Sequence, residues 1–474
     1  MTALASLRSA QPAAPAAALA SLWSEVGGDP GALARVALTG DEPVLPSSFA
    51  VGTAAQASIA ASALAAAEFS RLRTGRAQHV KVDMRHAAVE CRSERYLRVN
   101  GAPTPDLWDK IAGTYQCGDG RWVRLHTNFP HHRDGVLKLL RCDYDRDAVK
   151  RTLENWRAED FETAAAAAGL VVTAMRSFAE WDEHPQGRAV EKLPVLSIER
   201  IGDAPPEGLP GAERPLAGVR VLDLTRVIAG PVCGRTLAAH GADVLLVTAA
   251  HLPSVEPLVI DNGRGKLSAH LDLREAGGRE KLAELLRSAH VFVQGYRPGG
   301  LAALGFSPEA AAKLRPGIVY VSLCAYGHEG PWRNRRGFDS LVQTAMGFNH
   351  AEAQAAGIDR PKPLPMQELD HASGYFLAFG AMMALARRLT EGGSWHVRVS
   401  LAQTGRWLRN LGRLEHGLAC PDPSFEDVRD LLDETDSGFG RLTVVRPAAQ
   451  LSETPARWSR PSMPLGSHPP AWPS

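Results

Sequence analysis

Residues 219–247 read VRVLDLTRVIAGPVCGRTLAAHGADVLLV, and this stretch decides the fold of the chain. The apolar run at 219–224 predicts a buried strand, and the segment up to His240 predicts a helix that ends at Gly241. The apolar run at 244–247 predicts the next strand. Two strands joined through a helix are typical of a parallel sheet, because parallel neighbours need a crossover connection.

The same alternation continues along the chain. Apolar runs predict strands at 291–293 and 318–322, and the segments around 278–288 and 308–314 predict helices. The sequence therefore predicts an α/β fold with a Rossmann-like parallel sheet and helices on both faces. Ligands of such sheets bind beyond the carboxyl ends of the strands, so the candidate site is expected there.

One segment of the chain occurs twice. Residues 71–82, RLRTGRAQHVKV, align without gaps with residues 388–399, RLTEGGSWHVRV, and an Ala-rich stretch precedes each copy. This similarity indicates a duplicated helix-turn-strand unit. In the alignment Asp370, near the start of the second Ala-rich stretch, falls on Thr53. Only the second copy therefore offers a carboxylate at this position.

Residues 204–215 are rich in Pro and Gly and predict a linker, because such a run continues neither a helix nor a central strand. The linker separates an N-terminal part, residues 1–203, from the Rossmann-like domain at 216–408. Residues 409–474 form a C-terminal segment.

Composition restricts the partners of the chain. It has 53 Lys and Arg against 52 Asp and Glu, a net charge of +1, which favours small-molecule substrates over nucleic acid or an anionic membrane. The six cysteines are scattered without the spacing of a zinc site or a disulfide framework, so we expect no metal and a reducing, cytoplasmic location. The longest apolar run, residues 375–386, is too short to cross a bilayer.

Three loops carry residues suited to bind an anion or a planar ring. Residues 226–231 open a predicted helix, where backbone amides attract anions, although Gly-Pro also simply begins helices. Residues 263–268, GRGKLS, place two cations among glycines, as in a phosphate cradle, or else form an exposed basic turn. Residues 296–299, YRPG, offer an aromatic ring and a guanidinium for stacking, or only a turn.

Asp370 allows two interpretations from the residues alone. An Asp at the start of a helix caps it by accepting hydrogen bonds from the first-turn amides. A carboxylate in a partly buried pocket also attacks a thioester, forming a mixed anhydride.

Taken together, these positions resemble the class III CoA-transferases, the family of formyl-CoA transferase, carnitine CoA-transferase and the acyl-CoA racemases. The resemblance is carried by the order and spacing of six segments, residues 215–231, 241–244, 264–273, 296–299, 326–331 and 370–374. It implies an enzyme that moves coenzyme A between carboxylic acids, acts as a homodimer and needs no cofactor beyond its acyl-CoA substrate. It also implies a smaller α+β domain, here around residues 106–190.

The resemblance assigns Asp370 as the nucleophile, which forms first an acyl anhydride and then a CoA thioester. It implies further residues that contact CoA or line the route to Asp370: Arg226, Ile228, Ala229, Gly263, Arg264, Lys266, Gly295, Tyr296, Arg297, Arg336, Gly337, Phe338 and Asp339. Of these, Arg264 and Lys266 are expected near the nucleotide phosphates.

The chain departs from the family pattern in ways that keep two alternatives open. The small-domain segment precedes the Rossmann-like segment, so the chain order is rearranged. Thr248 replaces a usual acidic residue, and Gln294-Gly295 replaces a usual Glu-Asn. A racemase would need a histidine where Phe338 stands, because a phenyl ring moves no proton. An inactive CoA-binding homologue is the second alternative.

Overall fold

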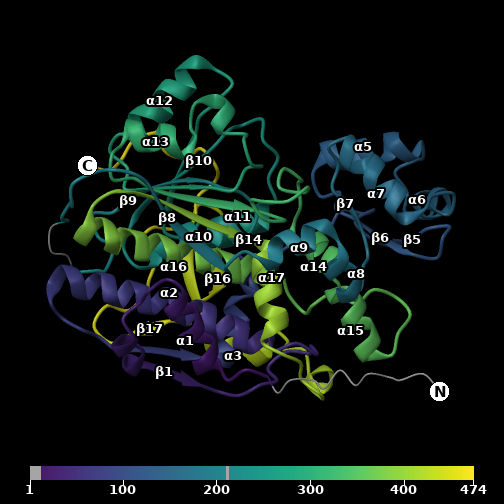
Figure 1. Ribbon diagram of the computed structural model, residues 1–474, viewed down its shortest axis with the longest axis horizontal. Coiled ribbons are helices and arrows are strands. Elements are labelled where there is room, and N and C mark those ends of the chain that lie inside the picture. The colour runs from purple at the N-terminus through teal and green to yellow at the C-terminus, as the bar shows by residue number, and fades with distance from the viewer. Residues whose placement is uncertain (1–11, 210–212, 474) are drawn as a thin grey trace.

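The computed structural model describes residues 12–209 and 213–473. Residues 1–11 and 210–212, the latter within the predicted linker, lie outside the described residues. The chain forms a large body around one central sheet and a smaller α+β body beside it, on the right in Figure 1.

The central sheet has seven strands in the order β11-β10-β9-β12-β13-β14-β8. Their bounds are β8 (Leu196–Gly202), β9 (Arg220–Leu224), β10 (Asp243–Thr248), β11 (Lys266–His270), β12 (Val291–Gln294), β13 (Val319–Cys324) and β14 (Ser394–Ser400). All neighbours are parallel except β8, which pairs antiparallel with β14 at the edge. The chain runs outward from β9 to β11 and then crosses back to β12, so the order reverses between β9 and β12. Such a switch point opens a crevice at the carboxyl ends of the strands.

Alternate residues of the strands face opposite sides of the sheet. Val221 belongs to the core that also holds α10 and α16, whereas Leu222 belongs to a second core with α12 and α13. The helices are α10 (Ala229–Ala239), α11 (Glu256–Asn262), α12 (Ala276–Leu286), α13 (Pro308–Leu314) and α16 (Glu368–Glu391). Both faces of the sheet are therefore covered by helices, and the predicted fold class is confirmed.

The smaller body is built from residues that precede the central sheet in the chain. Strands β5 (Gly113–Gln116), β6 (Trp122–Leu125) and β7 (Val172–Ala174) form an antiparallel sheet. Helices α5 (Pro130–Leu140), α6 (Arg146–Leu153) and α7 (Ala158–Ala167) supply side chains to its core. Helices α8 (Phe178–Glu183) and α9 (Pro185–Glu191) lead from it back toward the central sheet (Figure 1).

The duplicated segment is present twice in the structure. Helix α2 (Val51–Thr74) has the same length as α16, 24 residues, and both begin and end at positions that the sequence alignment pairs. Strand β2 (Val80–Asp83) leads directly into α3 (Met84–Glu90), just as β14 leads into α17 (Leu401–Asn410). Helices α2 and α16 pack against each other in the core of the large body (Figure 1).

The remaining elements surround this core. Strand β1 (Val36–Thr39) pairs parallel with β2, and β17 (Gln450–Leu451) pairs with the other edge of β2. Within the C-terminal segment, the hairpin of β15 (Leu432–Ser437) and β16 (Gly440–Val445) joins β3 (Arg98–Val99) and β4 (Ala102–Pro103). The other helices are α1 (Pro15–Glu25), α4 (Ser93–Tyr96), α14 (Asp339–Met346) and α15 (Phe348–Ala356), with short 3-10 turns at 30–35, 302–304, 417–419 and 426–431.

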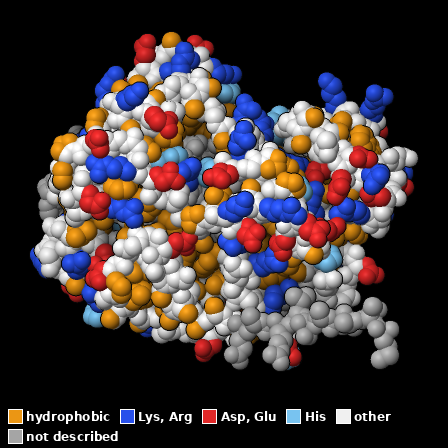
Figure 2. Space-filling model, in the orientation of Figure 1, with side chains coloured by type: hydrophobic (Ala, Val, Ile, Leu, Met, Phe, Trp, Pro, Cys, Tyr) orange, Lys and Arg blue, Asp and Glu red, His pale blue; other side chains and the backbone are white. Residues whose placement is uncertain are grey.

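The surface agrees with the balanced charge of the sequence. Figure 2 shows basic and acidic side chains interspersed over one face, without a broad field of either sign. A nucleic-acid-binding face is typically a basic patch or stripe, and this face has none. Within the described ranges, helices of sufficient length and apolarity to cross a membrane are absent.

Two glycines allow one substitution to be compared in two environments. A Cβ on Gly374 of α16 would lie 2.6 Å from the Ala229 carbonyl oxygen and from Val232 Cβ, whereas a Cβ on Gly277 of α12 would meet nothing within 4 Å. We expect Gly374→Ala to lower the free energy of unfolding by about 1–3 kcal/mol through overpacking. Gly277→Ala should instead raise it by up to about 1 kcal/mol, because Gly is a poor helix former. Urea denaturation measures both, and equal effects would contradict the close packing of α10 on α16.

Candidate functional site

A cavity of about 580 Å³ lies at the carboxyl ends of the central strands, where the strand order reverses. The loops after β9, β10, β11, β12 and β13 line it, and Phe129, His131 and His132 of the smaller body also contribute to its wall. The structure brings seven of the predicted site residues together here: Arg226, Gly295, Tyr296, Arg297, Arg336, Gly337 and Phe338. The sheet thus positions five separate loops of the chain around one space.

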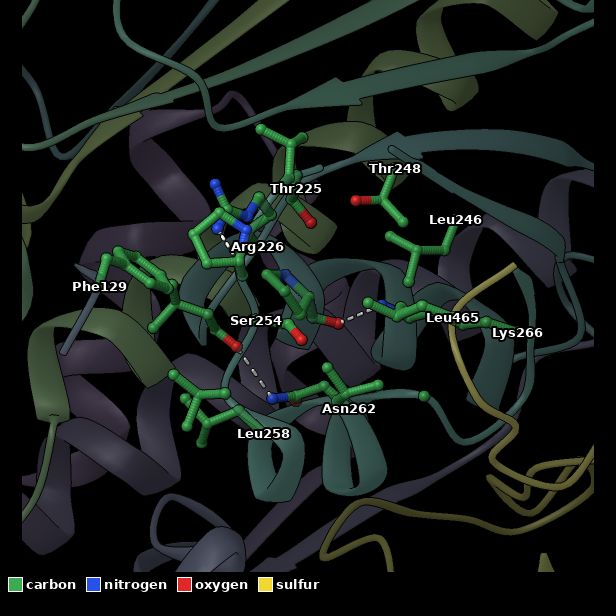
Figure 3. A pocket seen from close by; sticks show the side chains of 17 residues that line it. Phe129, Thr225, Arg226, Leu246, Thr248, Ser254, Leu258, Asn262, Lys266 and Leu465 are labelled. Atoms are coloured by element: carbon green, nitrogen blue, oxygen red, sulfur yellow. Dashed lines mark hydrogen bonds between the residues drawn. The ribbon is translucent and has the colours of Figure 1, made fainter. Parts of the chain in front are cut away.

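A small side chamber of about 50 Å³ shares wall residues such as Arg226 and Val227 with this cavity. Figure 3 shows the side chains that line the chamber. Its wall includes Asn262, Gly263 and Lys266, and Asn262 Nδ2 donates a hydrogen bond to the Val227 carbonyl oxygen at 3.3 Å. Val227 has a φ of 75°, a left-handed conformation that is strained for a β-branched residue. Backbone strain of this kind concentrates at binding sites, which supports a functional role for the loop between β9 and α10.

Arg264 and Lys266 do not lie where the sequence led us to expect them. Arg264 is 2% exposed, lines neither of these two cavities and donates to Asp261 Oδ1 at 2.6 Å. Lys266 is the first residue of β11 and donates to Asp223 Oδ2 at 2.8 Å. Both cations therefore neutralise internal carboxylates. Arg264 lines neither cavity, whereas Lys266 lines the side chamber, and a contact of either residue with the CoA phosphates stays a prediction. The alternative of an exposed basic turn is wrong.

Ile228 and Ala229 also lie apart from the two cavities. Ala229 is the first residue of α10, Ile228 is its N-cap, and both side chains are buried. Neither belongs to the wall of the large cavity or of the side chamber among the described residues. They shape the start of α10 without offering a surface to a ligand.

Asp370 lies in the first turn of α16 but does not cap it. The helix begins at Glu368 with Gln367 as its N-cap, and no side-chain cap bond forms there within the described chain. The interpretation of Asp370 as a helix cap is therefore wrong. Its carboxylate is 7% exposed and accepts no hydrogen bond from the described residues. A desolvated carboxylate without hydrogen bonds is a stronger nucleophile than one held by donors.

A second carboxylate lies beside it. The Asp370 N–H donates to Asp339 Oδ2 at 3.1 Å, and Gln343 Nε2 donates to Asp339 Oδ1 at 2.5 Å. Burial raises the pKa of Asp370 well above the usual range of an aspartate, and the Asp339 and Glu94 carboxylates raise it further. Burial also raises the pKa of Asp339, to about 6, although both hydrogen bonds oppose this shift.

Phe338 connects this pair of carboxylates to the large cavity. It precedes Asp339 in the chain and lines the cavity, and its ring stacks on His126 of the smaller body with centroids 3.9 Å apart. The rings of Phe129 and His132 lie 5.9 and 6.5 Å from the same ring. The sequence prediction missed these histidines, because no local pattern shows that a distant strand and helix reach the carboxyl edge of the sheet.

The raised pKa values predict how activity depends on pH. A carboxyl group acts as a nucleophile in its ionised form, so any activity that depends on the Asp370 carboxylate should show a kcat/KM that rises with pH as the pair ionises. Asp339→Asn removes a negative neighbour and so lowers the pKa of Asp370, which should move this acid limb to lower pH. A pH–rate profile measures the shift. Asp160→Asn, at an exposed position on α7, is the control; a limb that stays in place or moves to higher pH in Asp339→Asn would contradict the pairing.

The chain is similar in sequence to several curated CoA-transferases. A curated acyl-CoA transferase of Gibberella moniliformis is 29% identical over 367 residues, which cover 68% of this chain and 64% of that protein. A probable fatty acyl-CoA transferase (Rv3272) of Mycobacterium tuberculosis is 31% identical over 44% of this chain and 58% of its own. The succinyl-CoA:glutarate CoA-transferase of Mus musculus is 33% identical over 36% of this chain and 41% of its own. The chain thus spans less than two thirds of the length of these relatives.

The crystal structure of the Mycobacterium tuberculosis protein Rv3272 is similar at 32% sequence identity with a TM-score of 0.39, covering 42% of this chain and 57% of that one. A family model described as CoA-transferase family III matches residues 29–206 and 216–424, well over half of the chain. The match includes the smaller body, the central sheet and all the predicted site residues. The resemblance stated from the sequence is confirmed, and the chain belongs to CoA-transferase family III.

Proposed function

We propose that this protein transfers coenzyme A from an acyl-CoA to a second carboxylic acid, with Asp370 as the group that accepts the acyl chain. The observation that carries the proposal is the buried Asp370 carboxylate, which accepts no hydrogen bond from the described residues. Its backbone N–H is bonded to Asp339, and the residue before Asp339, Phe338, lines the large cavity at the switch point of the sheet. The relative from Mus musculus, whose name states transfer between succinate and glutarate, supports chemistry between two acids.

The proposed reaction proceeds in balanced steps. A carboxylate oxygen of Asp370 attacks the thioester carbonyl carbon, the carbon–sulfur bond breaks, and CoA leaves as the thiolate from the acyl-Asp370 anhydride. The thiolate then attacks Cγ of Asp370, which releases the donor acid and leaves an aspartyl-CoA thioester. The acceptor carboxylate attacks the same carbon and displaces the thiolate, giving a new anhydride. The thiolate finally attacks the acceptor carbonyl, which yields the new acyl-CoA and frees Asp370.

This scheme needs no cofactor besides the acyl-CoA substrate, because each step exchanges one acyl acceptor for another without oxidation or reduction. No group of three or more potential metal ligands occurs among the residues the structure describes. The homodimer and the cytoplasmic location stay predictions of the sequence. Sedimentation of the purified protein and fractionation of the cells that produce it test them.

Intact-mass spectrometry tests the proposal. With an acyl-CoA and no acceptor, wild type is expected to carry an acyl or CoA adduct that peptide mapping places on Asp370, and Asp370→Asn is expected to carry none. Asp160→Asn should form the adduct like wild type, because Asp160 is exposed on the smaller body. An adduct that persists in Asp370→Asn would overturn the assignment. CoA binding without adduct or turnover in all three proteins would instead identify a CoA-binding homologue.

A further inference from the structure

Four basic side chains gather where the smaller body meets the central sheet. His131 and His132 occupy the first turn of α5, Arg226 lies in the loop after β9, and Arg336 shortly precedes α14. All four line the large cavity. His131 and Arg336 are exposed within it, Arg226 is half-buried and His132 is buried. Three elements that are remote in sequence therefore converge on one corner of the cavity.

Among the residues that the structure describes, no carboxylate of the cavity wall is left to neutralise this basic corner, which consists of His131, His132, Arg226 and Arg336. The cavity wall contains one described carboxylate, Asp272, and it is bound to Arg274. Arg336 forms no ion pair or hydrogen bond through its side chain with the described residues. Burial, together with the neighbouring His131, Arg336 and Arg226, lowers the pKa of His132 to about 3. His132 is therefore neutral at pH 7, and the positive charge of the corner comes from Arg226 and Arg336. Positive charge without a counterion in a partly enclosed space attracts an anion.

The corner also offers unused hydrogen-bonding groups. His132 is 4% exposed, and its Nδ1 is buried without a hydrogen-bond partner in the part of the chain that the structure describes. Buried polar nitrogen atoms are normally satisfied, so a ligand is the natural partner of this atom. Phe129, the N-cap of the 11-residue helix α5, supplies no side-chain cap, which leaves the positive end of the helix facing the same corner.

The corner lies close to the reacting carboxylate. Phe338 separates the two: its ring is 6.5 Å from that of His132, and the next residue, Asp339, accepts the hydrogen bond from the Asp370 N–H. Asp339 and Asp370 do not line the large cavity themselves, so an acid that reacts at Asp370 would extend past Phe338 to reach the basic corner. The far end of such a molecule would meet Arg336 and the histidines.

We propose that the basic corner binds the second carboxylate of a dicarboxylic acid, so that the enzyme selects dicarboxylic over monocarboxylic substrates. This inference rests on the proposed CoA transfer through Asp370. The chemistry that the corner recognises is an oxyanion. A phosphate group of CoA is also an oxyanion, and measuring the affinity for CoA distinguishes it from the second carboxylate of a diacid.

The test compares matched acceptors. We expect wild type to use succinate, glutarate and adipate at least about 10-fold better in kcat/KM than butanoate, pentanoate and hexanoate, because a charge-assisted contact is lost with the monoacids. Arg336→Gln and His132→Asn should lower kcat/KM for the diacids about 10- to 100-fold more than that for the monoacids. Arg333→Gln, at an exposed arginine three residues from Arg336 and outside the cavity wall, is the matched control and should change neither.

Calorimetric titrations of the same variants separate the possible failures. Glutarate should bind to CoA-loaded wild type, and it should bind to CoA-loaded Arg336→Gln at least about 10-fold more weakly. This difference in binding does not require CoA transfer, so it tests the basic corner even if the proposed function fails. Equal use of diacids and monoacids by a wild type that transfers CoA would overturn the inference. Arg336→Gln could instead bind CoA itself more weakly and use diacids and monoacids equally poorly. That result would overturn the inference and identify a CoA phosphate as the ligand of the corner. Arg336 is exposed, so its variant tests the inference even if His132→Asn does not fold.

Discussion

Replacing Asp370 by asparagine is expected to lower kcat for CoA transfer by about four orders of magnitude or more. The amide keeps the shape of the side chain but does not form the anhydride, and loss of a nucleophile that carries a covalent intermediate commonly costs this much. The Asp370 carboxylate accepts no hydrogen bond from the described residues, so replacing it by an amide breaks no internal contact of the fold. Burial raises the pKa of this carboxylate, so removing it should not destabilise the protein at neutral pH.

The measurement is the steady-state rate with an acyl-CoA and an acceptor acid. The affinity for CoA and the urea midpoint should stay close to those of wild type, which separates lost chemistry from lost structure. Asp160→Asn serves again as the control and should retain full activity. A residual rate within about 10-fold of wild type would show that Asp370 is not the nucleophile.

Asp261→Ala is expected to cause the largest loss of stability, about 3–5 kcal/mol in the free energy of unfolding. Asp261 Oδ2 accepts from Arg235 Nη1 at 2.6 Å and Asp261 Oδ1 accepts from Arg264 Nη2 at 2.6 Å, and all three side chains are buried. Removing the carboxylate leaves two guanidinium groups without their counterion in a region that water does not reach. Arg264 is 2% exposed, and this burial lowers its pKa to about 10.

Urea denaturation followed by far-ultraviolet circular dichroism measures this loss. Glu434→Ala is the matched control: it breaks an ion pair with Arg441 on the exposed hairpin of β15 and β16, and we expect its urea midpoint to equal that of wild type. If Asp261→Ala were as stable as wild type, Arg264 would not be a structural residue, and its predicted role as a phosphate ligand would become the better interpretation.

The site was predictable from sequence where a loop follows a predicted strand. Arg226, Tyr296 and Arg297 come directly after runs that form β9 and β12, and parallel strands carry such loops to the same edge. Gly263–Ser268 misled the prediction, because cations between glycines look alike whether they face solvent or the interior. Their counterions, Asp223 and Asp261, are set by sheet register and helix packing, which a local pattern does not contain.

The duplicated unit shows the same limit. Sequence alignment identified the two copies and placed Thr53 opposite Asp370, since side chains along a shared helix keep their spacing. The alignment did not reveal that α2 and α16 pack against each other. An Ala-rich helix is apolar on most sides, so its sequence does not show which side meets another helix.

By itself, the sequence predicted the parallel sheet, its helices, the edge where the candidate site lies and the carboxylate that we propose as the nucleophile. These depend on periodicity and on residues near one another in the chain, which local backbone geometry dictates. Only the tertiary structure decided that Arg264 and Lys266 are internal, that Asp370 has Asp339 beside it and that His131 and His132 reach the cavity. Each of these facts is a contact between segments distant in sequence, and such contacts arise only when burial of the whole core fixes how the elements pack.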